Sequence, residues 1–341
     1  MKKKYRARNL LLAGFLIFAL LAAPGCRKPV TPVEGPEKTP PSVQEKDDGP
    51  SLTDPLTGRR VEQIVPLLAV MVDNLKPSRP QTGLGEAGIV YEIETEGAIS
   101  RFMALYAGDP PPDVGPVRSA RTYFLYLVQE WDAYYAHVGG SEDAKANIRR
   151  WGIGDLEGLG NTPGFWSDRT RRAPHNNYLN VAKALAGKTP KGIYRNWVFE
   201  EAPGGPPDYR EFSFRYSRDY QVTYRFSPER KEYLRYVNGD PHTDRVTGRQ
   251  LAATNVVVQY APHIFLGDAL GHIDVRLIGQ GRAEFFLAGK HQEGTWEKAG
   301  PSAPTKFYDS EGRPIRFVRG NTWIQVVRPE TPVTRVAPAG D

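Results

Sequence analysis

Between residues 115 and 131 the chain reads Gly115-Pro-Val-Arg-Ser-Ala-Arg-Thr-Tyr-Phe-Leu-Tyr-Leu-Val-Gln-Glu-Trp131, and the neighbouring elements can be placed around this stretch. Its apolar residues recur at the spacing of a helix with one buried face, at Ala120, Tyr123, Phe124, Leu127, Val128 and Trp131. The Gly-Pro pair ends the preceding element, and Ser119 is a candidate N-cap. We therefore expect a helix that begins near Ser119.

Two arginines, Arg118 and Arg121, stand at the start of this helix. The helix dipole is already positive there and disfavours each cation by roughly 0.3–1 kcal/mol. Backbone N–H groups, the Ser119 hydroxyl and two guanidiniums at one helix start are suited to bind an anion. That anion is either a carboxylate of the protein, which is the commoner case, or a bound ligand. We expect a mixed arrangement, in which Arg118 is paired internally and Arg121 faces a pocket.

The N-terminus has the pattern of a bacterial lipoprotein signal. Basic residues precede an apolar run over residues 10–23, which is too short for an ordinary membrane span and suits a signal-peptide core. The run ends Ala23-Pro-Gly-Cys26, which resembles a lipobox; an ordinary cleaved signal peptide is the alternative. Cys26 is the only cysteine, and lipid on it would hold the protein at the extracytoplasmic face of the cell membrane. We therefore interpret residues 1–26 as a lipoprotein signal peptide.

Composition limits the remaining possibilities. A single cysteine supports neither an intrachain disulfide nor a zinc–thiolate site. The net charge of +6 falls to about +1 once the five basic residues of the signal are removed, so it does not argue for a nucleic-acid partner. Residues 27–55 are rich in proline and charge and are expected to form a disordered tether. No cofactor is expected.

The rest of the sequence predicts two domains. Residues 56–200 mix strands with helices and indicate an N-terminal α/β sandwich around a mainly central sheet. The strands are expected at residues 66–73, 88–96, 100–106 and 133–138, and the further helices at residues 142–151 and 177–186. A Gly/Pro linker over residues 203–207 precedes a smaller, mostly β domain at residues 208–330. The fold class is therefore α+β or mixed α/β, with two separate domains.

Four acidic residues form a first candidate group. Glu92, Glu94 and Glu96 alternate along a predicted strand and should share one face, where like charges need cations nearby. Arg101, Arg118 and Arg121 are candidate partners. A divalent metal, with Asp73 as a further ligand, is a remoter alternative, because no spacing matches a defined metal loop. We therefore expect no metal.

A second group contains the candidate ligand-binding residues. His137 ends a strand, and Ser141 follows two glycines as a helix cap or, less plausibly, as a nucleophile, since the G-x-S-x-G pattern is absent. The loop that contains Arg169, Arg171, His175 and Asn176 is either a basic solvated loop or part of one anion site with Arg118 and Arg121.

Several motifs carry a family resemblance when they are taken in order. They are Met71-Val-Asp-Asn74, Pro77-Ser-Arg-Pro-Gln81, Ile89-Val-Tyr-Glu92, Glu96-Gly-Ala-Ile-Ser-Arg-Phe102, Gly115-Pro-Val-Arg-Ser-Ala-Arg121, His137-Val-Gly-Gly-Ser141 and Ala173-Pro-His-Asn176. From about Pro55 to its end the chain resembles the YerB-like lipoproteins, a family of unknown function found mainly in Gram-positive bacteria. The resemblance implies a signal-anchored lipoprotein with an α/β N-terminal domain and a strand-rich C-terminal domain. It implies no activity, so it assigns no catalytic residue.

Three functions fit the sequence. The first is a module that binds an anionic envelope ligand or partner, such as a cell-wall polymer or another envelope protein. The second is a hydrolase or transferase that acts on a cell-wall polymer, with Glu92, Glu94, His137 or His175 as acid and base; the carboxylate pair typical of such enzymes is not evident. The third is a protein-interaction scaffold whose arginines are purely structural. Trp296 and Trp323 could stack on sugars, although core packing is the commoner use of tryptophan.

The lipoprotein interpretation is tested by the substitution Cys26→Ser. The variant lacks the thiol that lipid would modify, so it should leave the membrane fraction and appear in the soluble fraction or the medium. Cell fractionation together with mass spectrometry of the N-terminal peptide measures this. Unchanged membrane retention without a lipid adduct on Cys26 would contradict the interpretation.

Overall fold

The computed structural model describes residues 52–191 and 197–338, which belong to one compact unit. The predicted signal peptide, Cys26 and most of the predicted tether lie outside the described residues. The end of that tether differs from the expectation, because β1 (Leu52–Thr53) pairs with β2 (Arg60–Val61) and the Asp54 carboxylate accepts a hydrogen bond from the Leu56 N–H. Within the described ranges, no helix has both the length and the apolar character needed to cross a bilayer.

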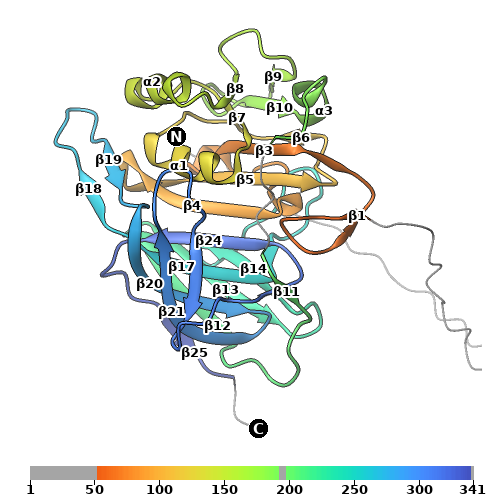
Figure 1. Ribbon diagram of the computed structural model, residues 1–341, viewed down its shortest axis with the longest axis vertical. Helices are drawn as coiled ribbons and strands as arrows, with labels where there is room; N and C mark the ends of the chain where they lie inside the picture. Colours follow the sequence, from red (N-terminus) through yellow and green to blue (C-terminus); the bar gives the residue numbers. More distant parts are fainter. Residues whose placement is uncertain (1–51, 192–196, 339–341) are drawn as a thin grey trace, which may run out of the picture. The chain divides into compact units, whose positions relative to one another are not determined.

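The largest element is a ten-stranded mixed sheet to which both halves of the chain contribute. Its order is β22 (Lys306–Asp309), β21 (Lys290–Lys298), β20 (Gly279–Leu287), β17 (Asn255–Tyr260), β24 (Thr322–Val327), β4 (Ile89–Thr95), β5 (Ile99–Gly108), β3 (Ile64–Asp73), β7 (Tyr134–His137) and β8 (Gly154–Glu157). In Figure 1 the orange strand β4 lies beside the blue strand β24, although the two strands are more than two hundred residues apart in sequence. The two strands run parallel.

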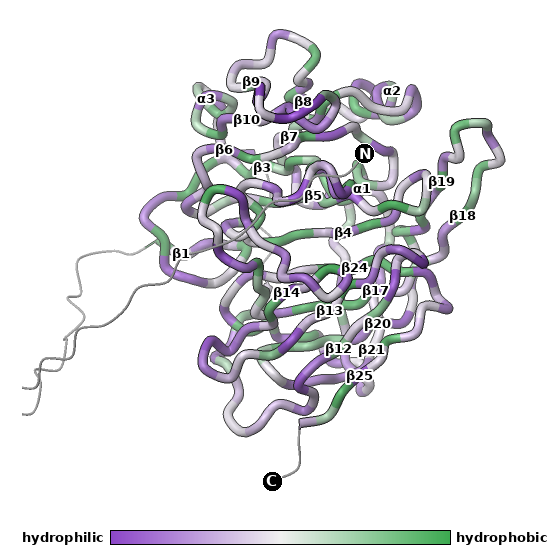
Figure 2. The backbone as a smooth tube through the Cα atoms, turned by 180° about the vertical axis from the view of Figure 1, so that it is seen from behind, coloured by the Kyte–Doolittle hydropathy of each residue, from purple (hydrophilic) through white to green (hydrophobic). Residues whose placement is uncertain are grey.

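Buried apolar side chains alternate between the two faces of this sheet. Along β3, Leu67, Ala69 and Met71 face one hydrophobic cluster, whereas Leu68 and Val70 face the other. This is the period of two that a strand buried on both sides requires. Figure 2 shows hydrophobic stretches, in green, along strands of the sheet.

One face of the ten-stranded sheet is covered by helices. The apolar residues of α1 (Thr122–Trp131) and α2 (Glu142–Arg150) share a core with β3, β4 and β5. The helix predicted near Ser119 therefore exists, but it begins at Thr122 with Arg121 as N-cap, and no side chain makes a capping bond there. Ser141 caps α2 as expected, since its hydroxyl accepts a hydrogen bond from the Ala144 N–H.

The other face is covered by a second sheet that comes from the C-terminal half. Its strands are β15 (Asp240–Pro241), β14 (Glu232–Val237), β13 (Tyr220–Ser227), β12 (Glu211–Ser217) and β25 (Thr334–Val336), and β16 (Ala252–Ala253) pairs with β14. Aromatic residues dominate the contact; for example, Phe212 stacks on Phe286 of the ten-stranded sheet. The molecule is thus a mostly β, layered structure in which the N-terminal and C-terminal parts of the chain share one sheet, and the expected α/β sandwich is present only where helices cover one face of that sheet.

Smaller elements complete the fold. They are a three-stranded sheet of β6 (Asp113–Val114), β10 (Asn177–Asn180) and β9 (Phe165–Ser167), the pair β11 (Phe199–Glu200) and β23 (Phe317–Val318), the pair β18 (His263–Phe265) and β19 (Ile273–Val275), the helix α3 (Val181–Leu185), and 3-10 turns at Lys76–Ser78, Leu84–Glu86 and Glu96–Ala98. The helix expected over residues 177–186 is therefore wrong in its first half, where β10 pairs with strands on both sides.

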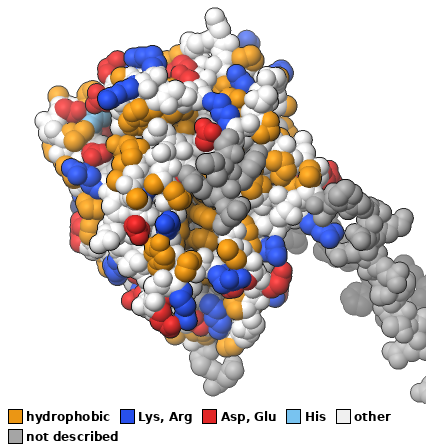
Figure 3. Space-filling model, viewed as in Figure 1, with side chains coloured by type: hydrophobic (Ala, Val, Ile, Leu, Met, Phe, Trp, Pro, Cys, Tyr) orange, Lys and Arg blue, Asp and Glu red, His pale blue; other side chains and the backbone are white. Residues whose placement is uncertain are grey.

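The hairpin formed by β18 and β19 projects from the rest of the fold (Figure 1). Phe265, Leu266 and Leu270 at its end are each more than half exposed. Elsewhere on the face drawn in Figure 3, basic and acidic side chains are interspersed, which agrees with the net charge near zero that remains when the five basic residues within residues 1–25 are left out.

Proteolysis tests the shared sheet. Gly204 and Gly205 lie in an exposed segment between the halves, so limited digestion should cut there. Because β4 is paired with β24 and the core between the two large sheets contains residues from both sides of the cut, the fragments should stay associated and co-elute in size-exclusion chromatography, and denaturant should be needed to separate them. Two fragments that separate under native conditions and each remain folded would show that the halves fold independently.

Candidate functional site

Three parallel strands end side by side at one edge of the ten-stranded sheet. β3, β7 and β8 run parallel and finish at Asp73, His137 and Glu157. The segment that carries Arg118 crosses this edge, because the Arg118 N–H donates to the Met71 carbonyl and its own carbonyl accepts from the Val138 N–H. Ligands of open α/β sheets commonly bind outside the carboxyl ends of parallel strands. This edge of the sheet is therefore a candidate ligand-binding site.

A buried carboxylate at this edge holds two basic side chains. Oδ2 of Asp73 lies 2.6 Å from Nδ1 of His175 and 3.1 Å from Nε of Arg118, and the latter contact is an ion pair without hydrogen-bond geometry. The other oxygen of Asp73 accepts a hydrogen bond from the Leu75 N–H. We call Asp73, Arg118 and His175 the Asp73 cluster. It confirms the expected internal pairing of Arg118.

The two basic members of the Asp73 cluster keep nitrogens that the protein does not use. The side chain of Asp73 is 1% exposed, whereas those of Arg118 and His175 are 20% and 15% exposed. Within the described residues, neither His175 Nε2 nor the terminal nitrogens of Arg118 have a hydrogen-bond partner. A carboxylate that fixes an imidazole by Nδ1 orients Nε2 outward, which is the usual way to position a functional histidine.

Loops on both sides of the cluster are held together by arginines. Nη2 of Arg171 donates to the Pro80 carbonyl at 2.6 Å and Nη1 to the Pro77 carbonyl at 3.2 Å, so the loop that bears His175 is fixed to the loop that follows Asp73. Arg79 in turn donates to the side-chain and backbone oxygens of Asn74. Arg169 is exposed. The backbone carbonyl of Asn176 accepts a hydrogen bond from the Asp168 N–H, which holds the two ends of this loop together.

A buried network of hydrogen bonds connects the Asp73 cluster to the C-terminal half of the chain. Arg235 on β14 donates to Oε2 of Glu92 at 2.7 Å, and both side chains are fully buried. Nε of Arg235 donates to Nδ1 of His242, whose Nε2 lies 2.7 Å from Oε1 of Gln81. Burial and the charge of Arg235 hold the pKa of His242 well below its usual range, so the ring is neutral with its proton on Nε2.

The network ends at the backbone of the site. Nε2 of Gln81 donates to the Asp73 carbonyl at 2.9 Å, and the Asn74 side chain donates to Glu92 at 3.1 Å. The position of Asp73 is thus coupled to an ion pair that joins the two halves of the chain. Sequence reasoning missed Arg235 and His242, because nothing in the local pattern of β14 or of residues 240–244 indicates their partners.

Arg121 has a different role from the expected one. Arg121 lines a hollow of about 380 Å³ together with Ser141, as expected for a residue that faces a pocket. Its guanidinium, however, forms an ion pair with Glu96. Nε of Arg121 donates to Oε2 of Glu96 at 2.9 Å, and Arg101 donates to Oε1 at 2.7 Å. Burial opposes ionisation of Glu96, but the hydrogen bond from Arg121 and the charges of Arg101 and Arg121 outweigh it and lower the pKa to about 2.

The remaining acidic and histidine candidates are also engaged. Glu94 forms a two-pronged ion pair with Arg328 on the C-terminal side of the chain, not with Arg118 or Arg121. His137 is buried, with Nε2 2.9 Å from Asp155 and Nδ1 2.8 Å from the Gly139 carbonyl. Burial disfavours its protonation, yet the pKa is raised because Asp155 and Glu157 stabilise the charged ring. The nine candidate ligand-binding residues therefore do not converge: Arg118 and His175 meet at Asp73, and Arg121 and Ser141 line another hollow.

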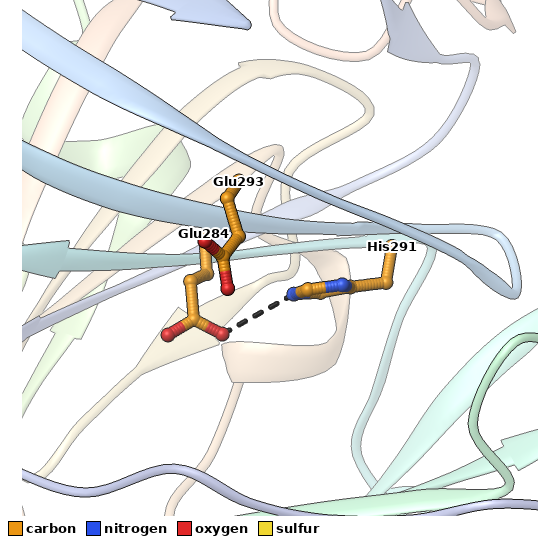
Figure 4. Close-up of side chains that lie close together, drawn as sticks. All are labelled: Glu284, His291 and Glu293. Carbon is orange, nitrogen blue, oxygen red and sulfur yellow. Dashed lines mark hydrogen bonds and ion pairs between the residues drawn. The ribbon is translucent and has the colours of Figure 1, made fainter. Parts of the chain in front are cut away.

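One group with metal-ligand chemistry was not expected from the sequence. Glu284, His291 and Glu293 face one another across the hairpin of β20 and β21 (Figure 4), and their ligand atoms lie within 4.8 Å of one another. Arg335 already binds Glu284, and its Nη2 lies 3.5 Å from Glu293. Burial opposes ionisation of Glu284, but hydrogen bonds from His291, Tyr260 and Arg335 lower its pKa to about 2. A guanidinium therefore supplies the positive charge that a metal would bring.

The Arg121–Glu96 ion pair can be tested by pH. A carboxyl group with a depressed native pKa stabilises the fold above its unfolded pKa, near 4.5, and loses this effect as pH falls through about 2. Arg121→Ala should therefore lower the melting temperature at neutral pH, and the gap from the wild type should narrow between about pH 4.5 and 2. Thermal unfolding of both proteins across this range measures it, with Arg172→Ala, an exposed arginine, as the matched control. A gap that stays constant with pH would show that Glu96 is not the partner that matters.

Comparison with known proteins places the chain in a family. The N-terminal domain described as "Protein of unknown function (DUF3048)" matches residues 56–194, and the corresponding C-terminal domain matches residues 212–324. The Bacillus subtilis protein named "Putative lipoprotein YerB" is 33% identical over 306 residues, which cover 84% of this chain and 90% of that protein. The crystal structure of YerB from Bacillus subtilis superposes with a TM-score of 0.74 at 30% identity and covers 83% of this chain and 99% of that chain. The chain therefore belongs to the YerB-like family, whose two domains are of unknown function.

Proposed function

We propose that this protein binds an anionic ligand of the cell envelope at the Asp73 cluster. The observation that carries the proposal is the use of one buried carboxylate oxygen to hold both His175 and Arg118 while their outer nitrogens remain unengaged within the described structure. Charge-assisted hydrogen bonds to an anion are about twice as strong as neutral ones, and a guanidinium can make two of them in parallel. Exposed Lys76 and Arg169 on the bordering loops add positive charge.

The same geometry gives less support to the two alternatives, a hydrolase or transferase of a cell-wall polymer and a protein-interaction scaffold. An enzyme that used Glu92, Glu94 or His137 would need groups that are already bound to Arg235, Arg328 and Asp155. Of the four candidate acid–base residues, this leaves His175, which is oriented by Asp73. A purely structural role explains the Glu92–Arg235 and Glu96–Arg121 pairs, but it gives no use to the outer nitrogens of Arg118 and His175.

The proposal includes a place in the cell. The Bacillus subtilis relative carries the name "Putative lipoprotein YerB", which is consistent with a lipid-anchored location at the membrane. We place the lipid on Cys26 and the folded unit on the extracytoplasmic face, where residues 27–51 would act as the spacer. Cell-wall polymers and other envelope proteins are then the anionic partners within reach.

Anion-dependent stability tests the binding site. Inorganic phosphate or sulfate that binds only the native state should stabilise it by about 1.4 kcal/mol at ten times Kd. For a chain of this size the melting temperature rises by about 2–4 °C for each kcal/mol. The rise should occur in the wild type and in the control Arg172→Gln, which removes the same charge from an exposed position.

Arg118→Gln and His175→Asn should abolish the rise, because each removes one donor to the anion. Differential scanning calorimetry at constant ionic strength, with chloride as the reference anion, separates binding from screening. The proposal is wrong if phosphate and sulfate leave the wild-type melting temperature unchanged, or if Arg172→Gln removes the effect as fully as Arg118→Gln.

A further inference from the structure

An exposed tryptophan lies on the small sheet next to the Asp73 cluster. Trp166 on β9 is 44% exposed, and its ring stacks on Tyr178 of β10 with 4.9 Å between ring centroids and 24° between planes. The indole N–H donates to Oδ1 of Asp113 at 3.0 Å. The ring is thus fixed in orientation, with one face against a buried tyrosine and the opposite face available to solvent.

No other tryptophan in the described part of the chain is exposed. Trp296 and Trp323, which the sequence left open for sugar stacking, are core residues together with Trp131. Trp151 is partly buried against Tyr126. The exposed indole is therefore a local feature of β9 and needs its own explanation, since an aromatic ring of this size is normally buried.

The backbone places the indole beside the anion site. The segment that begins with β6 runs antiparallel to β10, and the Val117 N–H donates to the Asn177 carbonyl at 2.6 Å, one residue before Arg118. On the other side of β10, Ser167 is paired with Asn177. The strand of Trp166 and the segment of Arg118 are thus two strand spacings apart, about 10 Å. The intervening loop, which starts after Ser167, ends near His175.

Polar groups at the edge of the indole are suited to hydroxyl groups. Asp113 receives the indole N–H and also the side-chain amide of Asn180, at 3.3 Å. A carboxylate here can accept hydrogen bonds from the hydroxyls of a sugar.

We infer that the ligand of this protein is a sugar that carries an anionic group, with the sugar ring on the exposed face of Trp166 and the anionic group at Arg118 and His175. This inference rests on the anion-binding function proposed above and names its ligand class. The C–H face of a pyranose buries apolar surface against the indole, and its hydroxyls can reach Asp113 and Asn180. Because the two backbones lie about 10 Å apart, a sugar with a charged substituent can extend from the indole toward Arg118.

Titrations with three probes test the ligand class: inorganic phosphate, glucose and glucose 6-phosphate. Binding is followed by tryptophan fluorescence and by calorimetry. Glucose 6-phosphate should bind at least about tenfold more tightly than phosphate, a difference of about 1.4 kcal/mol, and it should change the fluorescence, whereas glucose alone should bind weakly. Trp166→Leu should remove the tenfold gain and the fluorescence change while phosphate binding persists.

Two further variants guard against a folding artefact. Trp166→Phe keeps an aromatic face without the indole N–H, so it should retain most of the gain from the sugar. Trp151→Leu, at a partly buried tryptophan elsewhere, should leave all three affinities unchanged.

The outcomes distinguish a failure of the sugar inference from a failure of the anion-binding function on which it rests. If phosphate binds but glucose 6-phosphate binds no more tightly, or if Trp166→Leu has no effect, the sugar is wrong and the anion site stands. If adenosine monophosphate gains from Trp166 and glucose 6-phosphate does not, the platform serves a base and the carbohydrate class is wrong. If neither phosphate nor glucose 6-phosphate binds, the anion-binding function fails and this inference fails with it.

Discussion

The fully buried ion pair between Glu92 and Arg235 is the interaction on which the rest of the structure depends. Removing two charges from water costs several kcal/mol for each ion, and their attraction compensates only when the remaining donors and acceptors are satisfied. Here they are: Arg235 also donates to Tyr224, Tyr220 and His242, and Glu92 also accepts from Ser100 and Asn74. A network of this kind specifies one arrangement of its members, because any displacement leaves a buried group without a partner.

That constraint reaches the surface through a short series of contacts. Arg235 fixes His242, His242 meets Gln81, and Gln81 holds the backbone of Asp73, whose side chain positions Arg118 and His175. The C-terminal half of the chain therefore determines the geometry of a cluster built entirely from the N-terminal half. The candidate site therefore depends on both of the domains that the family models match.

Local patterns predicted much of the secondary structure and little of the site. The period of two along β3 and the apolar stripe of α1 depend on neighbouring residues, so they were visible in the sequence. The strand at Asn177–Asn180 was mistaken for a helix, because its pairing with β6 and β9 overrides its own periodicity. Asp73 and His175 are 102 residues apart, and Gln81 and His242 are 161 apart, so no spacing rule could join them. The sequence did identify Arg118 and His175 as candidates, but it could not tell which carboxylate holds them or that Arg121 is engaged by Glu96.

The parallel pairing of β4 with β24 has a consequence for how the chain reaches its folded state. In synthesis from the N-terminus, residues 89–95 emerge more than two hundred residues before residues 322–327, yet each strand pairs with the open edge of the other. Until β24 arrives, β4 presents unpaired N–H and C=O groups between apolar side chains, which is the condition that invites pairing with other chains. Contacts of such long sequence separation also slow folding. This fold therefore closes late, and β4 is most open to pairing with other chains in the interval before β24 emerges.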